Sequence, residues 1–587
     1  MNYNLNKIAA EAEKSTTGKA LRKLLPFMRQ ERKALIFAFI SIIISSGLNL
    51  AGPVLIGHTI DTYIQNKEYS GVLLFSGILL TMYLVSLVAN YAQARLMGGV
   101  GQRMLYSLRN TVFNKLQELP AAFFNQNKAG DLISRINNDT DKLNQFFSQS
   151  LMQFVGSIFT MVGAGIFLLA INIRLGAAGL IPALVLLAFT RIISPWVKKK
   201  NAASLKSTGD LSAEIQESLN NFKVIIAFNR RDYFRRRFNL VNKDNYKASV
   251  NAGLVNNIFL PVFTLCSNLA QLVVLAYGIH LIAAGNFTIG LLISYLAYVN
   301  TFYNPIRQLA ALWTNFQVAM AGWDRISHIL NLGTDMPFVE SGEVAAVNAP
   351  VIEFKDVSFH YPDGKDVLHH INFRMEQGKT YALVGPTGGG KSTTASLLAR
   401  LYDPTSGMVL LNGRDIRSYD ATERAKKIGF ILQEPFLFTG TLRENILYGN
   451  EQLAHLTNEE VEERLREAGL GRLLERFENG LETSVAAAGD SISLGQKQLI
   501  AFIRAVARNP DLLILDEATA NIDTVTEQLL QDILQKLPDT TTRVIIAHRL
   551  NTIENADEIF FVNSGEITRA GSFDHALKML LHDQRST

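Results

Sequence analysis

Three short segments in the second half of the chain have the residue types and spacing that bind and hydrolyse a nucleotide. The first matches the pattern G-x-x-x-x-G-K-[ST], in which glycines let the loop curl so that backbone N–H groups point at phosphate oxygens. Lys391 would supply a positive charge for the β- and γ-phosphates, and Ser392 would offer a hydroxyl to Mg²⁺. The residues expected to bind ATP here are Gly385, Pro386, Thr387, Gly388, Gly389, Gly390, Lys391, Ser392 and Thr393.

The other two segments supply acid and base groups. LLILDEAT (residues 512–519) ends an apolar run with two carboxylates. We expect Asp516 to hold the Mg²⁺ shell and Glu517 to orient or deprotonate the attacking water. RVIIAH places His548 directly after another apolar run. An isolated histidine is more often structural, but α/β proteins bind ligands at the C-terminal ends of strands, so His548 is a further catalytic candidate.

Short strands alternating with helices must position these residues. The apolar run Tyr381–Val384 precedes the phosphate-binding loop, and the helix-like TASLLARLY follows it. From Val351 onward, β-rich runs alternate with helical patterns, which predicts an α/β core with an antiparallel accessory sheet. The β-rich runs are VIEFKDVSFHY, KTYALVG, RAKKIGFIL, DLLILDE, TRVIIAH and EIFFVNSGEI.

The first half of the chain differs in composition, because charged residues are missing over long stretches. The apolar excess is confined to residues 34–306, and its last uncharged stretch is broken by the turn-like sequence 284–286. A helix needs about 20 apolar residues to cross a bilayer. The pattern therefore predicts an all-α membrane domain, and not the buried helices of a soluble protein. The predicted spans are 34–58, 71–93, 148–171, 174–193, 258–282 and 288–307.

Lysine and arginine set the expected orientation. The only Lys and Arg residues of the short segments on one side of the bilayer are Lys67 and Arg174. The long segments on the other side include two runs of three basic residues, 198–200 and 235–237. This bias predicts that both termini are cytoplasmic, and residues 18–32 have the pattern of a helix lying in the membrane interface. The net charge of +5 then reflects groups near lipid headgroups, so no nucleic-acid partner is expected.

Apart from Arg174, Arg191 and Arg307 near span ends, the spans contain amides but no Asp, Glu, Lys or Arg, so a proton relay is not expected. A weakly charged substrate fits such a pathway. The simpler interpretation for most of these amides is hydrogen bonding between helices. They are Asn49, Asn90, Gln149, Gln153, Asn256, Asn257, Asn268, Gln271, Asn300 and Asn304.

Two segments between the spans, 95–147 and 194–252, are far longer than a bilayer turn requires. Their charge pattern and shortage of proline predict that the spanning helices continue into the cytoplasm and turn there. Short helices at the tips, within Phe123–Leu143 and Gly209–Phe228, would either press on the nucleotide domain or belong to a solvated hairpin without a partner.

Taken in order, these segments resemble an ATP-binding-cassette exporter half-transporter of the bacterial multidrug or lipid type. The resemblance covers essentially the whole chain and is most specific in 351–575. It implies a type IV exporter membrane domain of six helices, fused to a P-loop ATPase domain, with ATP and Mg²⁺ as cofactors. It also implies that the tips at about 121–131 and 211–222 are coupling helices.

The resemblance assigns further residues. Tyr361 would stack on adenine, Gln433 would contact Mg²⁺ or water, and Asp523 would lie in the loop that joins two sites. His548 would be the switch histidine. Residues 492–496 (ISLGQ) look like the family signature L-S-G-G-Q, in which Ser493, Gly495 and Gln496 are retained.

Ser493 and Gly495 precede an amphipathic stretch, Gln496–Arg508, so the start of a helix there can face a phosphate. In the family that phosphate is bound by the loop of the other subunit. The resemblance thus implies a dimer that encloses two ATP molecules, with a homodimer slightly favoured over a heterodimer.

The chain departs from the family pattern in two places. Leu494 and Ile492 depart mildly from the signature. Residues 486–488 (AAA) lack the acidic residue that many exporters have, which puts the usual contact to the coupling helices in doubt.

These expectations divide the chain into four parts. They are a cytoplasmic N-terminus with an interfacial helix (1–32), a transmembrane domain (33–331), a linker (332–350) and an ATPase domain (351–587). The expected function is ATP-driven export of a hydrophobic or amphipathic compound across the bacterial cytoplasmic membrane by alternating access. Alternatives are a dedicated lipid flippase, a peptide exporter, or a nucleotide-gated channel or regulatory subunit.

Overall fold

The computed structural model describes residues 3–5, 7–8, 26–340, 349–362, 364, 366–486, 492–516, 524–546, 554–571, 575–576 and 578–579. The chain forms two compact units. One comprises Ala9–Leu116 and Gly130–Asn331, and the other comprises Met1–Ile8, Gln117–Ala129 and Leu332–Thr587. The second unit thus combines the predicted ATPase domain with the tip of the first excursion and with the start of the chain.

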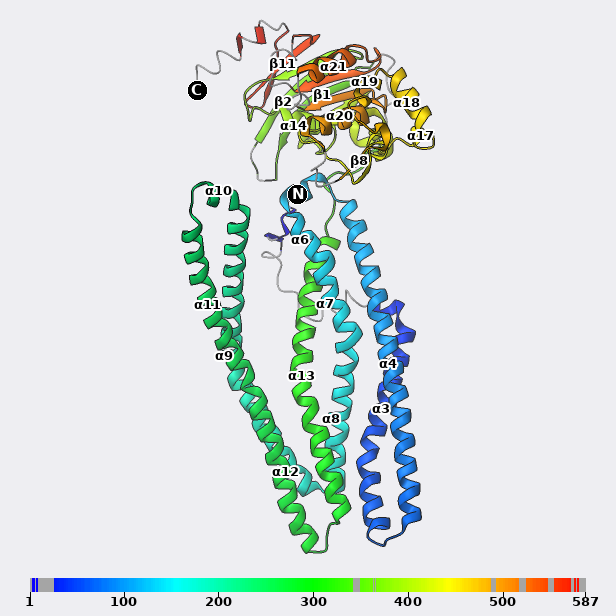
Figure 1. The fold of residues 1–587 in the computed structure, drawn as a ribbon, viewed down its shortest axis with the longest axis vertical. Coiled ribbons are helices and arrows are strands. Elements are labelled where there is room, and N and C mark those ends of the chain that lie inside the picture. Colours follow the sequence, from blue (N-terminus) through cyan, green and yellow to red (C-terminus); the bar gives the residue numbers. More distant parts are fainter. Residues whose placement is uncertain are drawn as a thin grey trace. The chain divides into compact units, whose positions relative to one another are not determined.

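The first unit is built from long helices (Figure 1). Five of its helices are long and apolar enough to cross a membrane, counted over the described residues: Arg32–Ile64, Tyr69–Gln117, Ala129–Ile171, Ile173–Asn220 and Arg231–Ala283. The individual elements are α3 (Arg32–Thr59), the π-helical η1 (Ile60–Ile64), α4 (Tyr69–Gln117), α6 (Ala129–Ser134), the π-helical η2 (Arg135–Asp139), α7 (Thr140–Gln145), the π-helical η3 (Phe146–Ser150), α8 (Leu151–Ile171), α9 (Ile173–Asn220), α10 (Phe222–Ala227), α11 (Arg231–Asn257), α12 (Phe259–Ala283) and α13 (Ile289–Leu330).

The predicted sixth span, 288–307, lies in α13, which is not among these five. Three tyrosines contribute polar groups to it, and their side chains are buried against neighbouring helices. The hydroxyl of Tyr298 donates to the Leu50 carbonyl at 2.5 Å, that of Tyr303 to the Gly179 carbonyl at 2.9 Å, and that of Tyr295 to the Asn172 carbonyl at 2.8 Å. A helix that faces other helices can carry polar groups, because those groups find partners there.

The second excursion, within residues 194–252, is a helical hairpin. The helices α9 and α11 run side by side to a tip at α10 (Figure 1). Asn201 and Asn256 exchange amide hydrogen bonds of 3.0 Å across the pair, and Arg237 pairs with the buried Glu214 at 2.8 Å. These contacts join the two helices where they carry few apolar side chains.

The nucleotide unit contains a parallel core sheet and an antiparallel sheet, as the sequence predicted. The core sheet has the order β12-β11-β3-β10-β9-β6, and its strands are parallel except β12 at the edge. The antiparallel sheet has the order β2-β1-β4-β5. The strands are β1 (Ile352–His360), β2 (Asp366–Met375), β3 (Thr380–Val384), β4 (Ser406–Leu411), β5 (Arg414–Asp415), β6 (Ile428–Ile431), β7 (Gly440–Thr441), β8 (Ser484–Val485), β9 (Leu512–Asp516), β10 (Thr542–Ile546), β11 (Glu558–Asn563) and β12 (Glu566–Arg569).

One predicted strand is partly wrong. The run RAKKIGFIL forms the helix α15 up to Lys427, and only Ile428–Ile431 is a strand. The reason is a helix cap, since the Asp420 side chain accepts a hydrogen bond from the Glu423 N–H at 2.7 Å. The helices of this unit are α5 (Ala121–Gln126), α14 (Lys391–Leu398), η4 (Ile416–Ser418), α15 (Ala421–Lys427), α16 (Leu442–Ile446), α17 (Glu451–Ala454), α18 (Asn458–Glu467), α19 (Gly471–Leu474), η5 (Gly480–Glu482), α20 (Leu494–Val506) and α21 (Thr524–Gln535).

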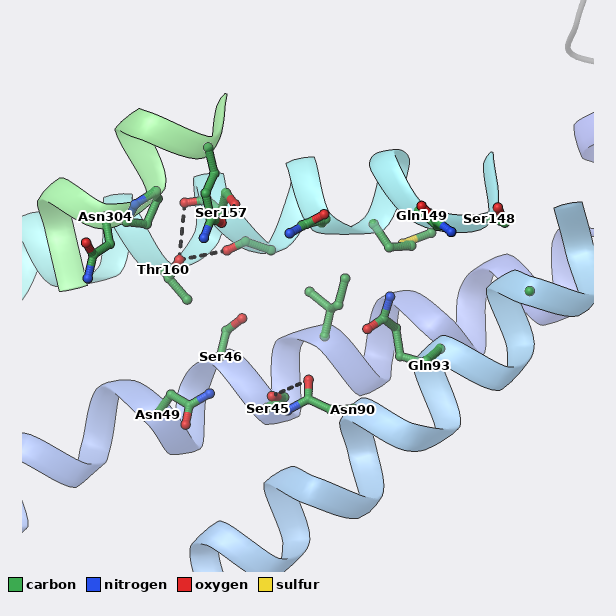
Figure 2. A pocket seen from close by; sticks show the side chains of 18 of the residues that line it. Ser45, Ser46, Asn49, Asn90, Gln93, Ser148, Gln149, Ser157, Thr160 and Asn304 are labelled. Carbon is green, nitrogen blue, oxygen red and sulfur yellow. Dashed lines mark hydrogen bonds between the residues drawn. The ribbon is translucent and has the colours of Figure 1, made fainter. Parts of the chain in front are cut away.

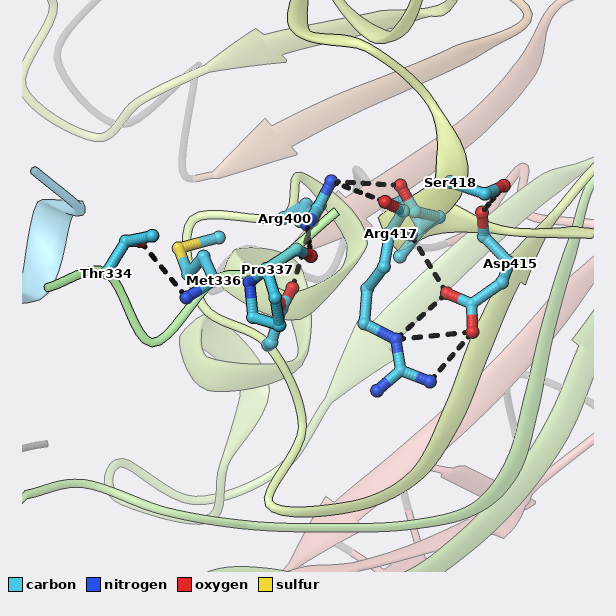
Figure 3. Close-up of polar contacts among 9 residues, drawn as sticks. Thr334, Met336, Pro337, Arg400, Asp415, Arg417 and Ser418 are labelled. Carbon is cyan, nitrogen blue, oxygen red and sulfur yellow. Dashed lines mark hydrogen bonds and ion pairs between the residues drawn. The ribbon is translucent and has the colours of Figure 1, made fainter. Parts of the chain in front are cut away.

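The connection that follows α13 is bound to the nucleotide unit by Arg400 (Figure 3). This buried guanidinium donates to the Pro337 carbonyl at 2.9 Å and to the Arg417 carbonyl at 3.3 Å, and it pairs with Asp403 at 3.0 Å. The Val339 N–H donates to the Arg417 carbonyl at 3.2 Å. One arginine thus joins the start of the predicted linker to the antiparallel half of the unit.

Candidate functional site

The phosphate-binding loop connects β3 to α14, as the pattern predicted. Gly385, Gly388 and Gly390 have φ values of +145°, +84° and +116°. Only glycine adopts such conformations without strain. A Cβ on Gly385 would also lie 2.0 Å from the Val562 carbonyl oxygen, so there is no room for a side chain at this turn.

Lys391 is the first residue of α14 and is 5% exposed. Its ammonium donates to the carbonyls of Gly385 (2.9 Å) and Pro386 (3.0 Å), so it lies inside the curve of the loop. Ser392 is exposed in the first turn of the same helix. A helix N-terminus with a lysine at its start has the positive potential and the N–H groups that bind phosphate.

Tyr361 lies next to this helix. Its hydroxyl is 3.1 Å from the Thr393 hydroxyl, and its ring makes edge contacts with Phe359 and Tyr402 at centroid distances of 4.9 and 5.4 Å. It is partly exposed, so one side of the ring remains accessible. The predicted adenine-stacking residue is therefore adjacent to the phosphate-binding loop.

The order of the core sheet brings the other candidates to the same edge. Ile546 of β10 pairs with Leu383 on one side and with Asp516 on the other, and Leu515 pairs with Ile431. Because β3, β10, β9 and β6 are parallel, their carboxyl ends lie together. That edge carries the phosphate-binding loop, Asp516 and, two residues after β6, Gln433. Glu517, Asp523 and His548 lie outside the described residues.

The signature segment begins a helix two residues earlier than predicted. The helix α20 starts at Leu494, and Ser493 is its N-cap. Ser493 and Gln496 form a capping box, in which the serine hydroxyl accepts from the Gln496 N–H at 3.2 Å and the glutamine carbonyl accepts from the Ser493 N–H at 3.0 Å. Reciprocal capping explains the earlier start, because it satisfies N–H groups of the first turn. Gly495 therefore lies within that turn.

The tip of the first excursion, α5, packs on the nucleotide unit. The Asn125 amide donates to the Tyr402 hydroxyl at 2.8 Å, and the Tyr402 ring contacts Tyr361. A chain of contacts thus runs from α5 through Tyr402 and Tyr361 to Thr393 beside the phosphate-binding loop. Sequence reasoning identified the tip but not Tyr402, which no motif marks.

The start of the chain binds to the same tip. The Asn127 amide donates to the Tyr3 carbonyl at 2.9 Å, the Leu5 N–H donates to the Asn127 side chain at 3.1 Å, and the Tyr3 N–H donates to the Gln126 side chain at 2.9 Å. The buried Tyr3 hydroxyl donates to the Asp335 carboxylate at 2.8 Å and accepts from the Asp335 N–H at 2.9 Å. Residues 3–5 therefore join α5 to the connection after α13. Nothing in the local sequence predicted this role.

The tip of the second excursion, α10, presents apolar side chains to its surroundings. Phe222, Val224, Ile226 and Phe228 are 53%, 54%, 43% and 74% exposed. A six-residue helix with an apolar exposed face is typical of an element that docks elsewhere.

Eight of the ten intramembrane amides fall into two groups. Asn256 pairs with Asn201, Gln271 donates to Asn300 at 3.0 Å, and Asn90 accepts from Ser45 at 2.9 Å, so interhelical bonding holds for these. The other group lines a cavity among α3, α4, α8 and α13, together with Asn90. Its members are Asn49, Gln149, Gln153 and Asn304.

Comparison with known proteins agrees with this architecture. A model described as ABC transporter transmembrane region matches residues 35–306, and one described as ABC transporter matches residues 368–520. An uncharacterized ABC transporter ATP-binding protein of Bacillus subtilis is 35% identical over 569 residues, which are 96% of this chain and 93% of the relative. A fatty acid ABC transporter ATP-binding/permease protein of Mycobacterium bovis is 35% identical over 508 residues, covering 86% and 80%. A multidrug resistance ABC transporter ATP-binding and permease protein of Lactococcus lactis is 30% identical over 567 residues, covering 96% and 95%.

Proposed function

Because the chain belongs to the ABC transporters, as an exporter-type half-transporter with an ATPase coupled to transport, we propose that it exports a hydrophobic or amphipathic compound by alternating access. In this proposal it works as a dimer with two composite ATP sites. The observation that carries the proposal is the core-sheet edge where the phosphate-binding loop, Asp516 and Gln433 meet, in a chain whose described residues include five membrane-length apolar helices.

In this proposal each residue at the edge has a role. Lys391 and the N–H groups of the loop bind the β- and γ-phosphates, and the exposed face of Tyr361 stacks on adenine. Glu517 and His548, which follow the carboxyl ends of β9 and β10, position the attacking water and the γ-phosphate. Hydrolysis needs little covalent chemistry from the protein, so positioning and charge do most of the work.

The donor set at this edge fits Mg²⁺. Ser392, Gln433 and Asp516 offer one hydroxyl, one amide oxygen and one carboxylate. Mg²⁺ is usually held by one or two carboxylates together with waters and substrate phosphates, and not by a cage of protein ligands. In line with this, the described residues contain no group of three or more His, Cys, Asp or Glu side chains that could hold a metal.

The composite sites require a second chain. The N-terminus of α20, with Ser493, Gly495 and Gln496, offers N–H groups and a helix dipole for a γ-phosphate, and we assign that phosphate to ATP bound by the partner's loop. Asp523 would connect the two sites. A homodimer is slightly favoured over a heterodimer, since this chain has a full set of candidate residues for both halves of the site.

We place the ATPase domain and both termini in the cytoplasm and the helical domain in the bacterial cytoplasmic membrane. Three features support this: the positive charge of the long excursions, the apolar helices, and the bacterial origin of the relatives. Relatives carry names that refer to fatty acids and to multidrug resistance. Both classes are amphipathic, which supports a substrate of that kind here.

The test uses Glu517→Gln in purified protein reconstituted into nanodiscs. We expect the variant to bind ATP normally and to hydrolyse it about 10² to 10⁴ times more slowly, since positioning and general-base roles contribute factors of that size. The control is Glu554→Gln, which makes the same Glu-to-Gln change at a residue that follows the last catalytic segment in the sequence. This control should leave the rate of ATP hydrolysis unaltered.

Rapid hydrolysis by Glu517→Gln would contradict the assigned role. A conductance that needs ATP binding but no turnover would instead favour a nucleotide-gated channel, because an exporter must hydrolyse ATP in each cycle.

A further inference from the structure

The membrane unit contains a cavity of about 980 Å³ (Figure 2). Residues from α3 and α4 face residues from η3, α8 and α13 across it. This volume is at the upper end of what small-molecule sites occupy. Its polar lining consists of six hydroxyl and eight amide side chains: Ser45, Ser46, Asn49, Asn90, Gln93, Gln102, Ser148, Gln149, Gln153, Ser157, Thr160, Thr301, Asn304 and Gln308.

Among the described residues that line the cavity, none is charged. The apolar part of the lining is Ile42, Ala94, Gly98, Met152, Gly156 and Pro305. Three arginines, Arg95, Arg103 and Arg307, are sequence neighbours of lining residues, but none of them lines the cavity. Arg103 forms a bidentate pair with Glu31, with both distances 2.7 Å, so its charge is already matched. An anion that entered the cavity would lose its hydration without gaining a counter-charge, which is costly.

Most of the amides are available to a ligand. Ser45, Ser86 and Asn90 form a small network, and Gln308 accepts from Ser157 at 3.5 Å. The remaining amides make no hydrogen bond within the part of the chain that the structure describes. They are Asn49, Gln93, Gln102, Gln149, Gln153 and Asn304.

The backbone contributes to this arrangement. The segment Phe146–Ser150 is π-helical and continues into α8. A π-helical turn shifts the register of the side chains that follow, and such turns occur frequently at functional sites. Here Ser148 and Gln149 of that turn line the cavity together with Met152 and Gln153 of α8.

We infer that this cavity binds a neutral amphiphile whose polar part carries several hydroxyl groups, in the manner of a glycosylated lipid. Each amide offers both a donor and an acceptor, and each hydroxyl of a sugar both donates and accepts, so the two sets match. Ile42, Met152 and Pro305 provide an apolar surface for the remainder of the ligand. The inference rests on the proposed export function and names the substrate class at this site.

The experiment compares three lipids built from the same fatty acid, of which two carry two oleoyl chains and one is the free acid. They are glucosyl dioleoylglycerol, dioleoylglycerol and oleate, added to the full-length protein in zwitterionic nanodiscs without nucleotide, with binding measured by native mass spectrometry. We expect the glucolipid to bind at least about tenfold more tightly than the other two, because only its sugar satisfies several amides at once.

Single substitutions locate the site. Asn49→Leu and Gln153→Leu should each weaken glucolipid binding about fivefold to tenfold, which is the loss of one or two hydrogen bonds. Asn268→Leu is the matched control, since this amide is exposed on α12 and does not line the cavity. Gln149→Lys should instead increase oleate binding, because it adds the missing counter-charge.

Equal binding of dioleoylglycerol and the glucolipid would overturn the role of the hydroxyl groups, and tighter binding of oleate would overturn the exclusion of charge. Equal losses in Asn49→Leu and Asn268→Leu would remove the assignment to this cavity. Mg-ATP hydrolysis is measured on the same samples. Its absence from the wild type would reject the proposed export function, whereas intact hydrolysis with the wrong lipid preference would reject only the substrate class.

Discussion

At the scale of single residues, the phosphate-binding loop is already folded around its lysine. The ammonium of Lys391 is held by two carbonyls of the same loop, and three glycines take φ values that exclude side chains. The loop thus keeps its shape through its own hydrogen bonds, and a nucleotide would exchange carbonyl partners of the lysine for phosphate oxygens. Charge-assisted bonds to phosphate are the stronger ones.

The first prediction separates the contribution of the Lys391 charge to ATP affinity from that of the Tyr361 ring. Lys391→Ala should reduce ATP affinity about a hundredfold or more, since a bond to a charged group contributes about 1.5–3 kcal/mol and the lysine contacts more than one phosphate. Tyr361→Ala should reduce it only about fivefold, the loss of one aromatic contact worth about 1 kcal/mol. The fluorescence anisotropy of a labelled ATP analogue measures the affinity of both variants.

Tyr361→Phe controls for the hydrogen bond to Thr393, because it keeps the ring and removes the hydroxyl. Its affinity should stay near that of the wild type. Wild-type affinity in Lys391→Ala would mean that the nucleotide binds elsewhere.

At the scale of elements, three segments far apart in the sequence meet at α5. Residues 3–5 contact Asn127 at one end and Asp335 at the other, and Asn125 reaches Tyr402. The Tyr3 ring also contacts Phe123 at a centroid distance of 6.3 Å. Burial, followed by the hydrogen bond to Asp335, raises the pKa of the Tyr3 phenol above its ordinary value.

The second prediction concerns this junction. Tyr3→Phe keeps the ring in its packing but removes both hydrogen bonds to Asp335. We expect amides within 121–127 and 333–337 to exchange about fivefold faster, because a net hydrogen bond contributes about 1 kcal/mol and opening of the junction becomes easier by that amount. Hydrogen–deuterium exchange with mass spectrometry measures the change.

Tyr106→Phe is the control, since Tyr106 is 71% exposed on α4. It should leave exchange in both segments unaltered. Unchanged exchange in Tyr3→Phe would show that the start of the chain does not stabilise α5.

At the scale of the whole molecule, each half of the proposed nucleotide sandwich lies on a different part of the ATPase unit. The phosphate-binding loop precedes α14, and the signature residues cap α20, so each offers the N-terminus of its own helix to phosphate. In the proposed dimer, ATP links the loop of one chain to the signature of the other. Closure of that dimer is the step that would move α5 and α10 and open the membrane unit outward.

The third prediction tests this closure. Native mass spectrometry should show two copies of the chain, and spin labels on exposed Lys536→Cys should move to short mutual distances when Mg-ATP is added to Glu517→Gln. The native cysteine, Cys266, is buried and is replaced before labelling. Ser493→Arg should bind ATP and yet prevent the short distances, because its side chain blocks the approach of phosphate to α20.

Labels that stay far apart in Glu517→Gln with ATP bound would exclude the sandwich for this chain. A measured mass that requires a different second subunit would replace the homodimer by a heterodimer.

The sequence by itself determined those features whose physics is local. A glycine-rich loop with a lysine folds into the same curl wherever a strand and a helix flank it, and apolar stretches of membrane length become helices because lipid leaves no other partner for the backbone. The carboxylates at the end of β9 were predicted in the same way. Capping was the local signal that was overlooked, since Asp420 caps a helix where a strand was predicted, and Ser493 starts a helix earlier than the hydrophobic pattern indicated.

Only the tertiary structure decided which distant groups meet. The strands β2 and β4 were not predicted from the sequence. They form because each of them pairs with β1, which lies between them in the sheet. The ten intramembrane amides look alike in the sequence, yet helix packing pairs some and turns others into one cavity. Tyr3 acquires its role through contacts with residues more than a hundred positions away, and no local pattern encodes a contact of that kind.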